Sequence, residues 1–238
     1  MVFGQGRAVA RSRLLQGVEI VENRGKGKFI TFEGPDGAGK TTQIQLIEDF
    51  LEEQGYSVVR MREPGGTRLS EAIRQLLLDP SYKEMSAATE ALLYAAARAQ
   101  LVNEVILPAL AAGKVVLCDR FVDSSLAYQG YGRSLDLERL RMVNGFALNK
   151  LGAFRTILLD LPPEEGFRRS ADKIERDRLE QESLSFHRRV REGYLRLADS
   201  FPERIRVVDA SGEPESVQEQ IEKHVLKYLT GRDPGGSF

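Results

Sequence analysis

Short apolar runs alternate along this chain with segments in which apolar residues recur at helical spacing. The run over 29–32 is β-branched and aromatic and ends in a glycine-rich turn, and the segment 42–54 that follows has a helical pattern. Further runs, separated by helical pattern, lie at 57–61, 115–118, 156–159 and 205–208. Nearly continuous apolar strands that alternate with helices are typical of a parallel sheet covered on both faces. We therefore predict a three-layer α/β fold around a five-stranded parallel sheet, with the ligand at the carboxyl ends of the strands.

The pattern indicates one domain over 28–230. No repeat, low-complexity tract or linker rich in Pro, Gly or Ser divides it. Residues 1–27 carry Arg7, Arg11 and Arg13 before their first acid, a composition that transit peptides share, but they lack the apolar centre of a secretory signal. We interpret 1–27 as a disordered N-terminal extension and 231–238 as a frayed tail.

Composition narrows the class of protein. The 238 residues include 34 Lys plus Arg and 35 Asp plus Glu, and this net charge of −1 argues against a sequence-independent binder of nucleic-acid polymers. Only one cysteine, Cys118, is present, so neither an intramolecular disulfide nor a multi-cysteine metal site is expected. No apolar run approaches the roughly 20 residues of a membrane-spanning helix. We expect a cytoplasmic protein that does not bind membranes.

The turn after the first apolar run carries the most specific motif. Residues 34–41 match G-x-x-x-x-G-K-[ST], the phosphate-binding loop or P-loop, between a predicted strand and a predicted helix. Its glycines let backbone N–H groups converge on phosphate oxygens. Lys40 is expected to reach the β- and γ-phosphates, and the Thr41 hydroxyl to bind Mg²⁺. The predicted nucleotide-binding residues are Gly34, Pro35, Asp36, Gly37, Ala38, Gly39, Lys40, Thr41 and Thr42.

The motif predicts a nucleoside triphosphate but not its reaction. Guanine-reading GTPases carry N-K-x-D, and the nearest segment here, 149–152, is Asn-Lys-Leu-Gly. Asp119 follows the third predicted strand, where it can hold magnesium through water, and Arg120 comes next. An adjacent acid and arginine favour phosphoryl transfer between two phosphorylated molecules.

Four segments in order resemble bacterial thymidylate kinases, which are P-loop nucleoside-monophosphate kinases, and the resemblance extends from about residue 28 to 228. The segments are FEGPDGAGKTT (32–42), REPGGT (62–67), TEALLYAAAR (89–98) and DRFVDSSLAYQG (119–130). The resemblance implies a P-loop NTPase fold with a helical lid, Mg²⁺- and ATP-dependent phosphorylation of dTMP to dTDP, and a homodimer.

The resemblance also implies an acceptor site. Tyr94 is expected to stack on thymine, and Arg98, one helical turn later, to hydrogen-bond the base. Without the resemblance, an ordinary core aromatic is a plausible alternative for Tyr94. Arg74 and Arg120 are expected at the dTMP phosphate. The remaining expected acceptor-site residues are Asp36, Glu63, Ser124, Ser125, Tyr128 and Gln129.

Three of these residues carry more specific expectations. Asp36 matches a carboxylate at the sugar or its metal shell, although Pro-Asp-Gly is also a strong turn sequence. Glu63-Pro64 matches a site that often has a cis peptide bond. Tyr128 is expected to exclude a 2′-hydroxyl and so to disfavour UMP.

A charged segment over 167–182 has two interpretations. Its composition alone favours a solvated helix with ion pairs, whereas the resemblance makes it the lid that closes on ATP. The lid candidates for contact with the phosphates are Arg169, Lys173, Arg176 and Arg178. With Lys40, Asp119 and Arg120, we predict Lys173 and Arg176 as catalytic residues. Residues 209–211 are expected at the adenine, and His187 is expected to be a packing or surface residue.

Two alternatives stay open. One is a kinase for another small acceptor, such as a different nucleoside monophosphate or a deoxynucleoside. The other is a P-loop switch that binds nucleotide and signals to a protein partner, against which the missing guanine-reading aspartate counts.

Overall fold

The computed structural model describes residues 27–171 and 177–231. The predicted extension, the tail and the predicted catalytic residues Lys173 and Arg176 therefore lie outside the described residues, apart from Gly27 and Gly231. Five parallel strands form one sheet in the order β2-β3-β1-β4-β5. They are β1 (Lys28–Glu33), β2 (Val58–Arg62), β3 (Val115–Asp119), β4 (Arg155–Asp160) and β5 (Ile205–Asp209). The predicted five-stranded parallel sheet is confirmed.

The central strands have the apolar sequences that a doubly covered sheet requires. In β1, β3 and β4 nearly every residue is buried, whereas the edge strands β2 and β5 have several partly exposed positions. Phe32 of β1 lies opposite Asp119 of β3 in the parallel register. This register brings the carboxyl end of β1, which leads into the P-loop, next to the Asp119–Arg120 pair.

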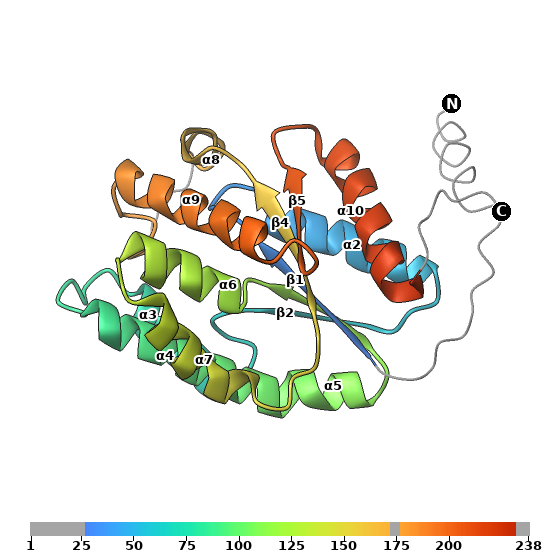
Figure 1. Cartoon of the computed structure of the whole chain (residues 1–238), viewed down its shortest axis with the longest axis horizontal. Helices are drawn as coiled ribbons and strands as arrows, with labels where there is room; N and C mark the ends of the chain where they lie inside the picture. The colour runs from blue at the N-terminus through green and yellow to red at the C-terminus, as the bar shows by residue number, and fades with distance from the viewer. Residues whose placement is uncertain (1–26, 172–176, 232–238) are drawn as a thin grey trace, which may run out of the picture.

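Helices cover both faces of the sheet, as Figure 1 shows. On one face α2 (Lys40–Glu53) and α10 (Pro214–Thr230) pack through Ile44, Ile47 and Ile221. Most of the remaining helices and two π-helical turns, η1 and η2, cover the other face. The remaining elements are α3 (Arg68–Leu78), α4 (Ala87–Leu101), η1 (Val102–Ile106), α5 (Leu107–Ala111), α6 (Val122–Ser125), η2 (Leu126–Gly132), α7 (Leu137–Leu148), α8 (Pro163–Arg169) and α9 (Leu184–Ser200). Of these, α3 packs chiefly on α4 and α8 on α9.

The start of α2 differs from the starts of α3, α4, α7 and α9. Side-chain oxygens of Thr67, Ser86, Asp136 and Ser183 accept backbone N–H bonds at the starts of α3, α4, α7 and α9. At α2 the capping position is Gly39, with φ of 80° and no side chain. The first N–H groups of α2 therefore point into the P-loop without a side-chain cap, as an anion-binding helix terminus requires.

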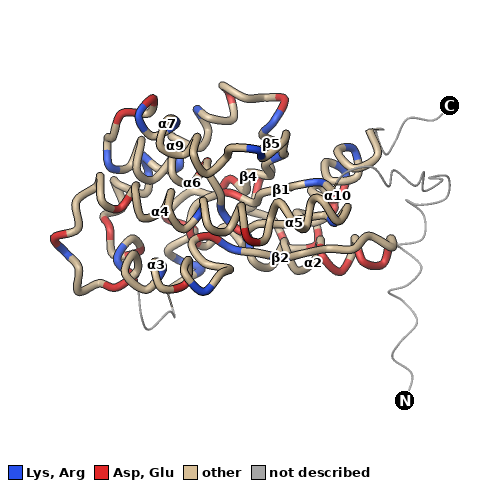
Figure 2. The backbone as a smooth tube through the Cα atoms, turned by 90° about the horizontal axis from the view of Figure 1, so that it is seen from below, with Lys and Arg blue, Asp and Glu red and all other residues tan. Residues whose placement is uncertain are grey.

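Charge is distributed over the whole fold. Figure 2 shows Lys and Arg interspersed with Asp and Glu along the helices, in keeping with the net charge of −1. Within 27–171 and 177–231, no helix combines the length and apolar character needed to cross a membrane.

Candidate active site

A cavity of about 510 Å³ opens at the carboxyl ends of the central strands. The P-loop forms one side, and residues of α3, α4, α6 and η2 form the other. The sequence-predicted residues that line it are Asp36, Gly37, Gly39, Lys40, Thr41, Thr42, Glu63, Arg74, Tyr94, Asp119, Arg120, Ser124, Ser125, Tyr128, Gln129 and Arg169. The two halves of the predicted site thus share one cavity.

The P-loop curls around the ammonium group of Lys40. Lys40 Nζ donates hydrogen bonds to the carbonyl oxygens of Gly34 at 3.1 Å and Pro35 at 2.8 Å. Gly37, at φ 79°, lies so close to α8 that a Cβ would lie 2.5 Å from the carbonyl oxygen of Gly166. Glycine is required there both by the positive φ and by this contact.

Lys40 is almost completely buried. Burial and the nearby positive charge of Arg120 lower the pKa of Lys40 to about 8, although Asp119 and Asp36 oppose the shift. An anion bound in the loop stabilises the charged form of Lys40.

Thr41 and Asp119 form a candidate magnesium site. The Thr41 hydroxyl donates to Asp119 Oδ2 at 2.9 Å, so both oxygens lie at one point of the cavity wall. Among the described residues no group of three His, Cys, Asp or Glu side chains could hold a metal. A pair of hard oxygen donors fits Mg²⁺, which keeps several waters and completes its shell with substrate phosphates.

Arg120 joins the P-loop to the acceptor side. It follows β3 with φ of 66°, in the left-handed region that non-glycine residues rarely adopt. Its Nη2 donates to Asp36 Oδ1 at 2.6 Å, and its Nη1 donates to the carbonyl of Gly34 at 3.0 Å. Tyr128 OH donates to the other Asp36 oxygen at 2.9 Å. Burial alone would raise the pKa of Asp36, but Arg120 and Lys40 outweigh it and lower that pKa to about 2.

A buried carboxylate that the sequence did not single out lies behind Arg120. Glu33, fully buried at the end of β1, accepts bonds from the backbone N–H of Phe121 at 2.8 Å and from Ser124 Oγ at 2.5 Å. Tyr194 OH of α9 contacts Glu33 at 3.2 Å and Arg120 Nη1 at 3.2 Å. Burial and the nearby Asp123 raise the pKa of Glu33 to about 7. Glu33 anchors the turn that presents Arg120.

The acceptor side differs from expectation at Arg98. Its side chain is 1% exposed and does not line the cavity. It forms an ion pair with Glu63 at 2.7 Å, donates to Ser125 Oγ at 3.0 Å and also bonds Asn144 Oδ1. Arg98 therefore lies behind the wall formed by Ser125, rather than reaching the cavity as expected. Tyr94 lines the cavity and also packs against an apolar cluster that includes Tyr128 and Phe186.

Glu63 and Arg74 lie where the chain leaves β2. The Glu63-Pro64 peptide bond is cis, as predicted. Arg74 of α3 lines the cavity and donates to the carbonyl oxygen of Pro64 at 3.0 Å. Burial raises the pKa of Glu63 to about 7, against the opposing charge of Arg98.

The described lid candidates point in different directions. Arg169, at the end of α8, lines the cavity and donates to the carbonyls of Ala210 at 3.0 Å and Ser211 at 3.2 Å, in the segment predicted to hold adenine. Arg178 is directed away and forms an ion pair with Glu90 at 2.6 Å. His187 is buried against Phe167 and Phe186, as a packing residue would be.

Comparisons with known proteins identify the family of this chain. A sequence model described as thymidylate kinase matches residues 32–221. The chain belongs to the thymidylate kinase family. It is 54% identical over 207 residues to the thymidylate kinase of Exiguobacterium sibiricum, with 87% of this chain and 98% of that protein covered. The thymidylate kinase of Symbiobacterium thermophilum is 52% identical over 207 residues, covering 87% and 96%.

A solved structure extends the likeness to three dimensions. The crystal structure of thymidylate kinase from Ehrlichia chaffeensis has a TM-score of 0.68 and 32% identity, covering 84% of this chain and 99% of that one. The predicted P-loop NTPase fold is confirmed, and the chain is a nucleoside-monophosphate kinase of the thymidylate kinase family.

Sequence reasoning missed three residues that shape the site. Glu33 and Glu90 lie inside the quoted segments, but nothing in their local pattern distinguished a buried carboxylate from a solvated one. Tyr194 lies in an amphipathic helix, where its spacing reads as core packing. For Glu33 the available signal of a buried carboxylate was a charged residue directly after the apolar run 29–32.

Proposed function

We propose that this chain transfers the γ-phosphoryl group of ATP to dTMP, giving ADP and dTDP, by an in-line displacement with Mg²⁺. The observation that carries the proposal is the direct contact between the two halves of the cavity. Arg120 bonds both the P-loop carbonyl of Gly34 and the Asp36 carboxylate, so the expected phosphate ligands of donor and acceptor lie side by side. Phosphoryl transfer between two nucleotides needs this juxtaposition.

On the donor side the chain supplies a cradle of backbone N–H groups and one movable cation. In the proposed complex Lys40 gives up its bonds to the carbonyls of Gly34 and Pro35 and turns to the β- and γ-phosphates. Thr41 would bind Mg²⁺ directly and Asp119 through water. When bound, Mg²⁺ neutralises charge on the phosphates. Arg169, which bonds the carbonyls of Ala210 and Ser211, and the segment 209–211 are the proposed contacts for adenine.

On the acceptor side, side chains from several elements would hold dTMP. Tyr94 offers its ring to thymine, and Arg98 acts on the base through Ser125, whose hydroxyl it orients. Arg74 and Arg120 are the proposed clamps for the phosphate, as forked guanidinium groups suit phosphate oxygens. The other proposed acceptor residues are Asp36, Glu63, Ser124 and Gln129.

Tyr128 is the proposed basis for the preference for deoxyribose. Its ring is almost fully buried, and its hydroxyl is fixed on Asp36 at 2.9 Å. Because packing holds the ring and Asp36 holds its hydroxyl, the Tyr128 side chain cannot move away from a 2′-hydroxyl. The ribose of UMP would therefore clash with this ring.

The chemistry needs no general base. The attacking phosphate oxygen of dTMP is already anionic near neutral pH, so the residues act by positioning the reactants and by neutralising charge. The cations proposed for this are Lys40 and Arg120, together with Lys173 and Arg176, which lie outside the described residues.

We also propose that a second copy of the chain covers the face formed by α3, α4 and α7. α4 packs against both of its neighbours, and each of the three helices exposes large apolar side chains. They are Leu69, Leu76, Leu92, Met142 and Phe146, of which Phe146 is 85% exposed. A row of this kind is typical of an interface. Phe146→Asp is expected to convert a dimer to a monomer in light scattering, and a monomeric parent chain would contradict the proposal.

The proposed location is the cytoplasm, where both nucleotides are available and a lone thiol such as the buried Cys118 stays reduced.

A direct assay tests the proposed reaction. The purified chain is incubated with ATP, dTMP and Mg²⁺, and ADP and dTDP are separated by chromatography. Equal amounts of both products are expected, and chelation of Mg²⁺ with EDTA should abolish transfer. Slow ATP hydrolysis that dTMP does not accelerate would contradict the proposal and favour a nucleotide-binding switch.

A further inference from the structure

A second buried carboxylate, Glu90, lies on α4 one helical turn before Tyr94. It is completely buried, and three side chains bind it. Gln129 Nε2 donates to Oε1 at 2.8 Å, Arg133 Nη2 donates to Oε2 at 3.1 Å, and Arg178 Nη1 lies 2.6 Å from Oε2. Although burial by itself raises the pKa of Glu90, the bonds from Arg133 and Gln129 outweigh it, so the pKa lies below its ordinary value. Glu90 is therefore a buried anion.

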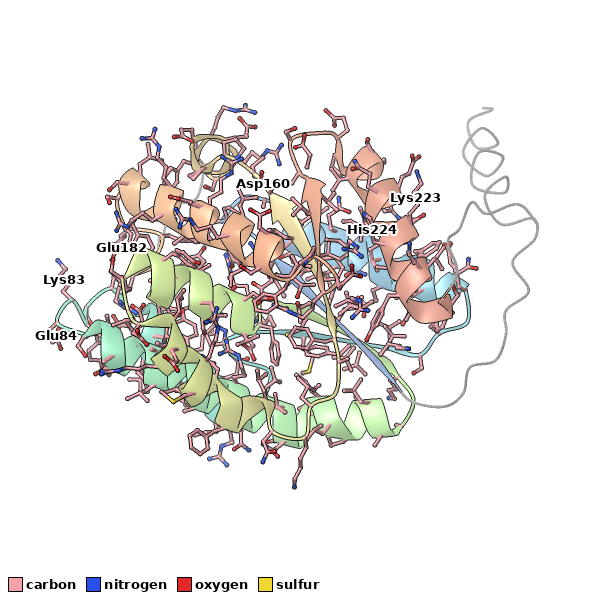
Figure 3. The ribbon with its side chains drawn as sticks, viewed as in Figure 1. Lys83, Glu84, Asp160, Glu182, Lys223 and His224 are labelled. Carbon is pink, nitrogen blue, oxygen red and sulfur yellow. The ribbon has the colours of Figure 1, made fainter. Side chains whose placement is uncertain are left out.

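The two arginines reach further chain segments. Arg178 donates through its backbone N–H to the carbonyl of Leu78 at 3.1 Å and through Nε to the carbonyl of Leu77 at 3.0 Å, at the end of α3. Arg133 Nη1 pairs with Glu182 at 2.5 Å. Figure 3 shows Glu182 beside the first turn of α9. The four charges balance, with two acids against two arginines. We call Glu90, Arg133, Arg178 and Glu182 the Glu90 cluster.

Every segment that the cluster joins also lines the cavity. Leu78 ends α3, and Gln129 belongs to η2. In the segment 177–182, Asp177, Leu179 and Glu180 face the cavity, whereas Arg178 between them turns to Glu90. The cluster thus fixes three walls of the acceptor side, together with the helix that carries Tyr94.

We propose that Glu90 is a positioning residue for the acceptor nucleotide, and that Arg178 tethers the segment 177–182 to the acceptor wall instead of contacting the phosphates. The inference rests on the proposed function, because it assigns these walls to dTMP. Loss of a cluster member lets Gln129 and the segment 177–182 move, and binding of the acceptor suffers. The P-loop lies on the other side of the cavity and keeps its own contacts, so binding of ATP does not suffer.

The first test separates a tether from a phosphate ligand. In Arg178→Met, with steady-state rates measured at varied dTMP and then at varied ATP, we expect KM for dTMP to rise about tenfold. We expect kcat to stay within about threefold and KM for ATP to stay unchanged. A fall in kcat of about a hundredfold at constant KM for dTMP would show a phosphate ligand and overturn the proposal, as would unchanged parameters. Arg196→Met, which breaks an exposed pair with Glu192, is the matched control.

The second test separates positioning from stability. Glu90→Gln leaves Arg178 and the partly buried Arg133 with one acid, so we expect a lower melting temperature. The double variant Glu90→Gln/Arg178→Met restores the charge balance. We expect it to regain most of the melting temperature and to keep the raised KM for dTMP. Recovery of both would mean that the cluster serves only stability and would overturn the proposal.

A folded variant is available should the buried substitutions fail to fold. Arg133→Lys keeps the charge but loses the fork that spans Glu90 and Glu182, and its side chain is 20% exposed. It is expected to raise KM for dTMP several-fold without changing KM for ATP, and an unchanged KM for dTMP would overturn the proposal. If the parent chain forms no dTDP from dTMP, the proposed function fails instead.

Discussion

The two halves of the cavity are built in different ways. On the donor side one continuous segment, 34–42, supplies the loop, the lysine and the helix start. On the acceptor side the walls come from α3, α4, α6, η2 and the segment 177–182, and buried ion pairs hold them together. The residues of the donor side come from one local motif. Those of the acceptor side come from distant segments and are brought together only when the chain folds.

Charge differs in the same way between the halves. On the donor side, the ammonium group of Lys40 donates to the carbonyl oxygens of Gly34 and Pro35, and within 27–171 and 177–231 it forms no ion pair. Its pKa is lowered to about 8. On the acceptor side, Arg120 is paired with Asp36 and Arg98 with Glu63, whereas Arg74 bonds the carbonyl oxygen of Pro64. On the donor side, Lys40 can therefore form an ion pair with a bound anion. On the acceptor side, Arg98 and Arg120 are already held by ion pairs before an anion binds.

The largest expected effect on turnover comes from removing the cation of the donor side. Lys40→Ala removes the charge proposed to face the β- and γ-phosphates, and turnover is expected to fall by on the order of 10³. Circular dichroism and melting temperature should remain close to those of the parent chain. The control is Lys223→Ala on the exposed side of α10, expected to be without effect. Retained activity in Lys40→Ala would remove the P-loop from the mechanism.

The next largest effect tests the joint between the two sides of the cavity, by which we mean Arg120 with its bonds to Asp36 and Gly34. Arg120→Lys keeps the charge but cannot bond Asp36 and Gly34 at once, so kcat/KM for dTMP is expected to fall about 10². Steady-state kinetics with dTMP as the varied substrate provide the measurement. Arg74→Lys is the comparison, because Arg74 bonds the carbonyl oxygen of Pro64 and not the P-loop, and we expect this variant to raise KM for dTMP with little change in kcat. Equal losses of kcat in both variants would contradict a special role for Arg120 at the joint.

A smaller effect tests the shape of the acceptor half. Tyr128→Ala opens the space that the ring fills, and discrimination against UMP relative to dTMP is expected to relax about tenfold. The matched variant Tyr128→Phe loses only the bond to Asp36 and should keep most of the discrimination. The ratio of kcat/KM values for the two acceptors is the measurement. An unchanged ratio in Tyr128→Ala would rule out exclusion of the 2′-hydroxyl by this ring.

The smallest effect tests the electrostatic difference between the halves. With a pKa of about 8, Lys40 is largely charged at pH 6.5 and largely neutral at pH 9. Triphosphate binding favours the charged form, so ATP binding should take up a fraction of a proton at pH 8.5 to 9 and almost none at pH 6.5. Calorimetry in two buffers of different ionisation enthalpy measures this uptake. Lys40→Arg, which stays charged, should show none, and equal uptake by both chains would assign the proton elsewhere.

The sequence predicted the donor half more completely than the acceptor half. The five strands and the helix after the P-loop lie where apolar runs and helical spacing placed them, because these patterns are local. Arg98 shows the limit, since its spacing from Tyr94 was read correctly as one helical turn, but its direction is set by Glu63, 35 residues away. Tyr194 meets Glu33 across 161 residues. Buried polar pairs of this kind depend on the tertiary fold, and helical or strand periodicity does not reveal them.

The charged segment over 167–182 shows the same limit. Composition favoured a solvated helix and the resemblance favoured a lid, and neither distinguished Arg169 from Arg178. In the described part, α8 ends at Arg169, which turns to the segment 209–211, and Arg178 turns to Glu90. Only contacts with distant segments distinguish the two arginines.

The most direct test of the account is a phosphorylation assay of the unaltered chain with ATP, Mg²⁺ and one of five acceptors: dTMP, dUMP, UMP, dCMP and AMP. The account predicts the highest kcat/KM for dTMP, a lower value for dUMP, and values at least about a hundredfold lower for UMP, dCMP and AMP. A chain that phosphorylates UMP or AMP as efficiently as dTMP would contradict the acceptor site described for Tyr94, Ser125 and Tyr128.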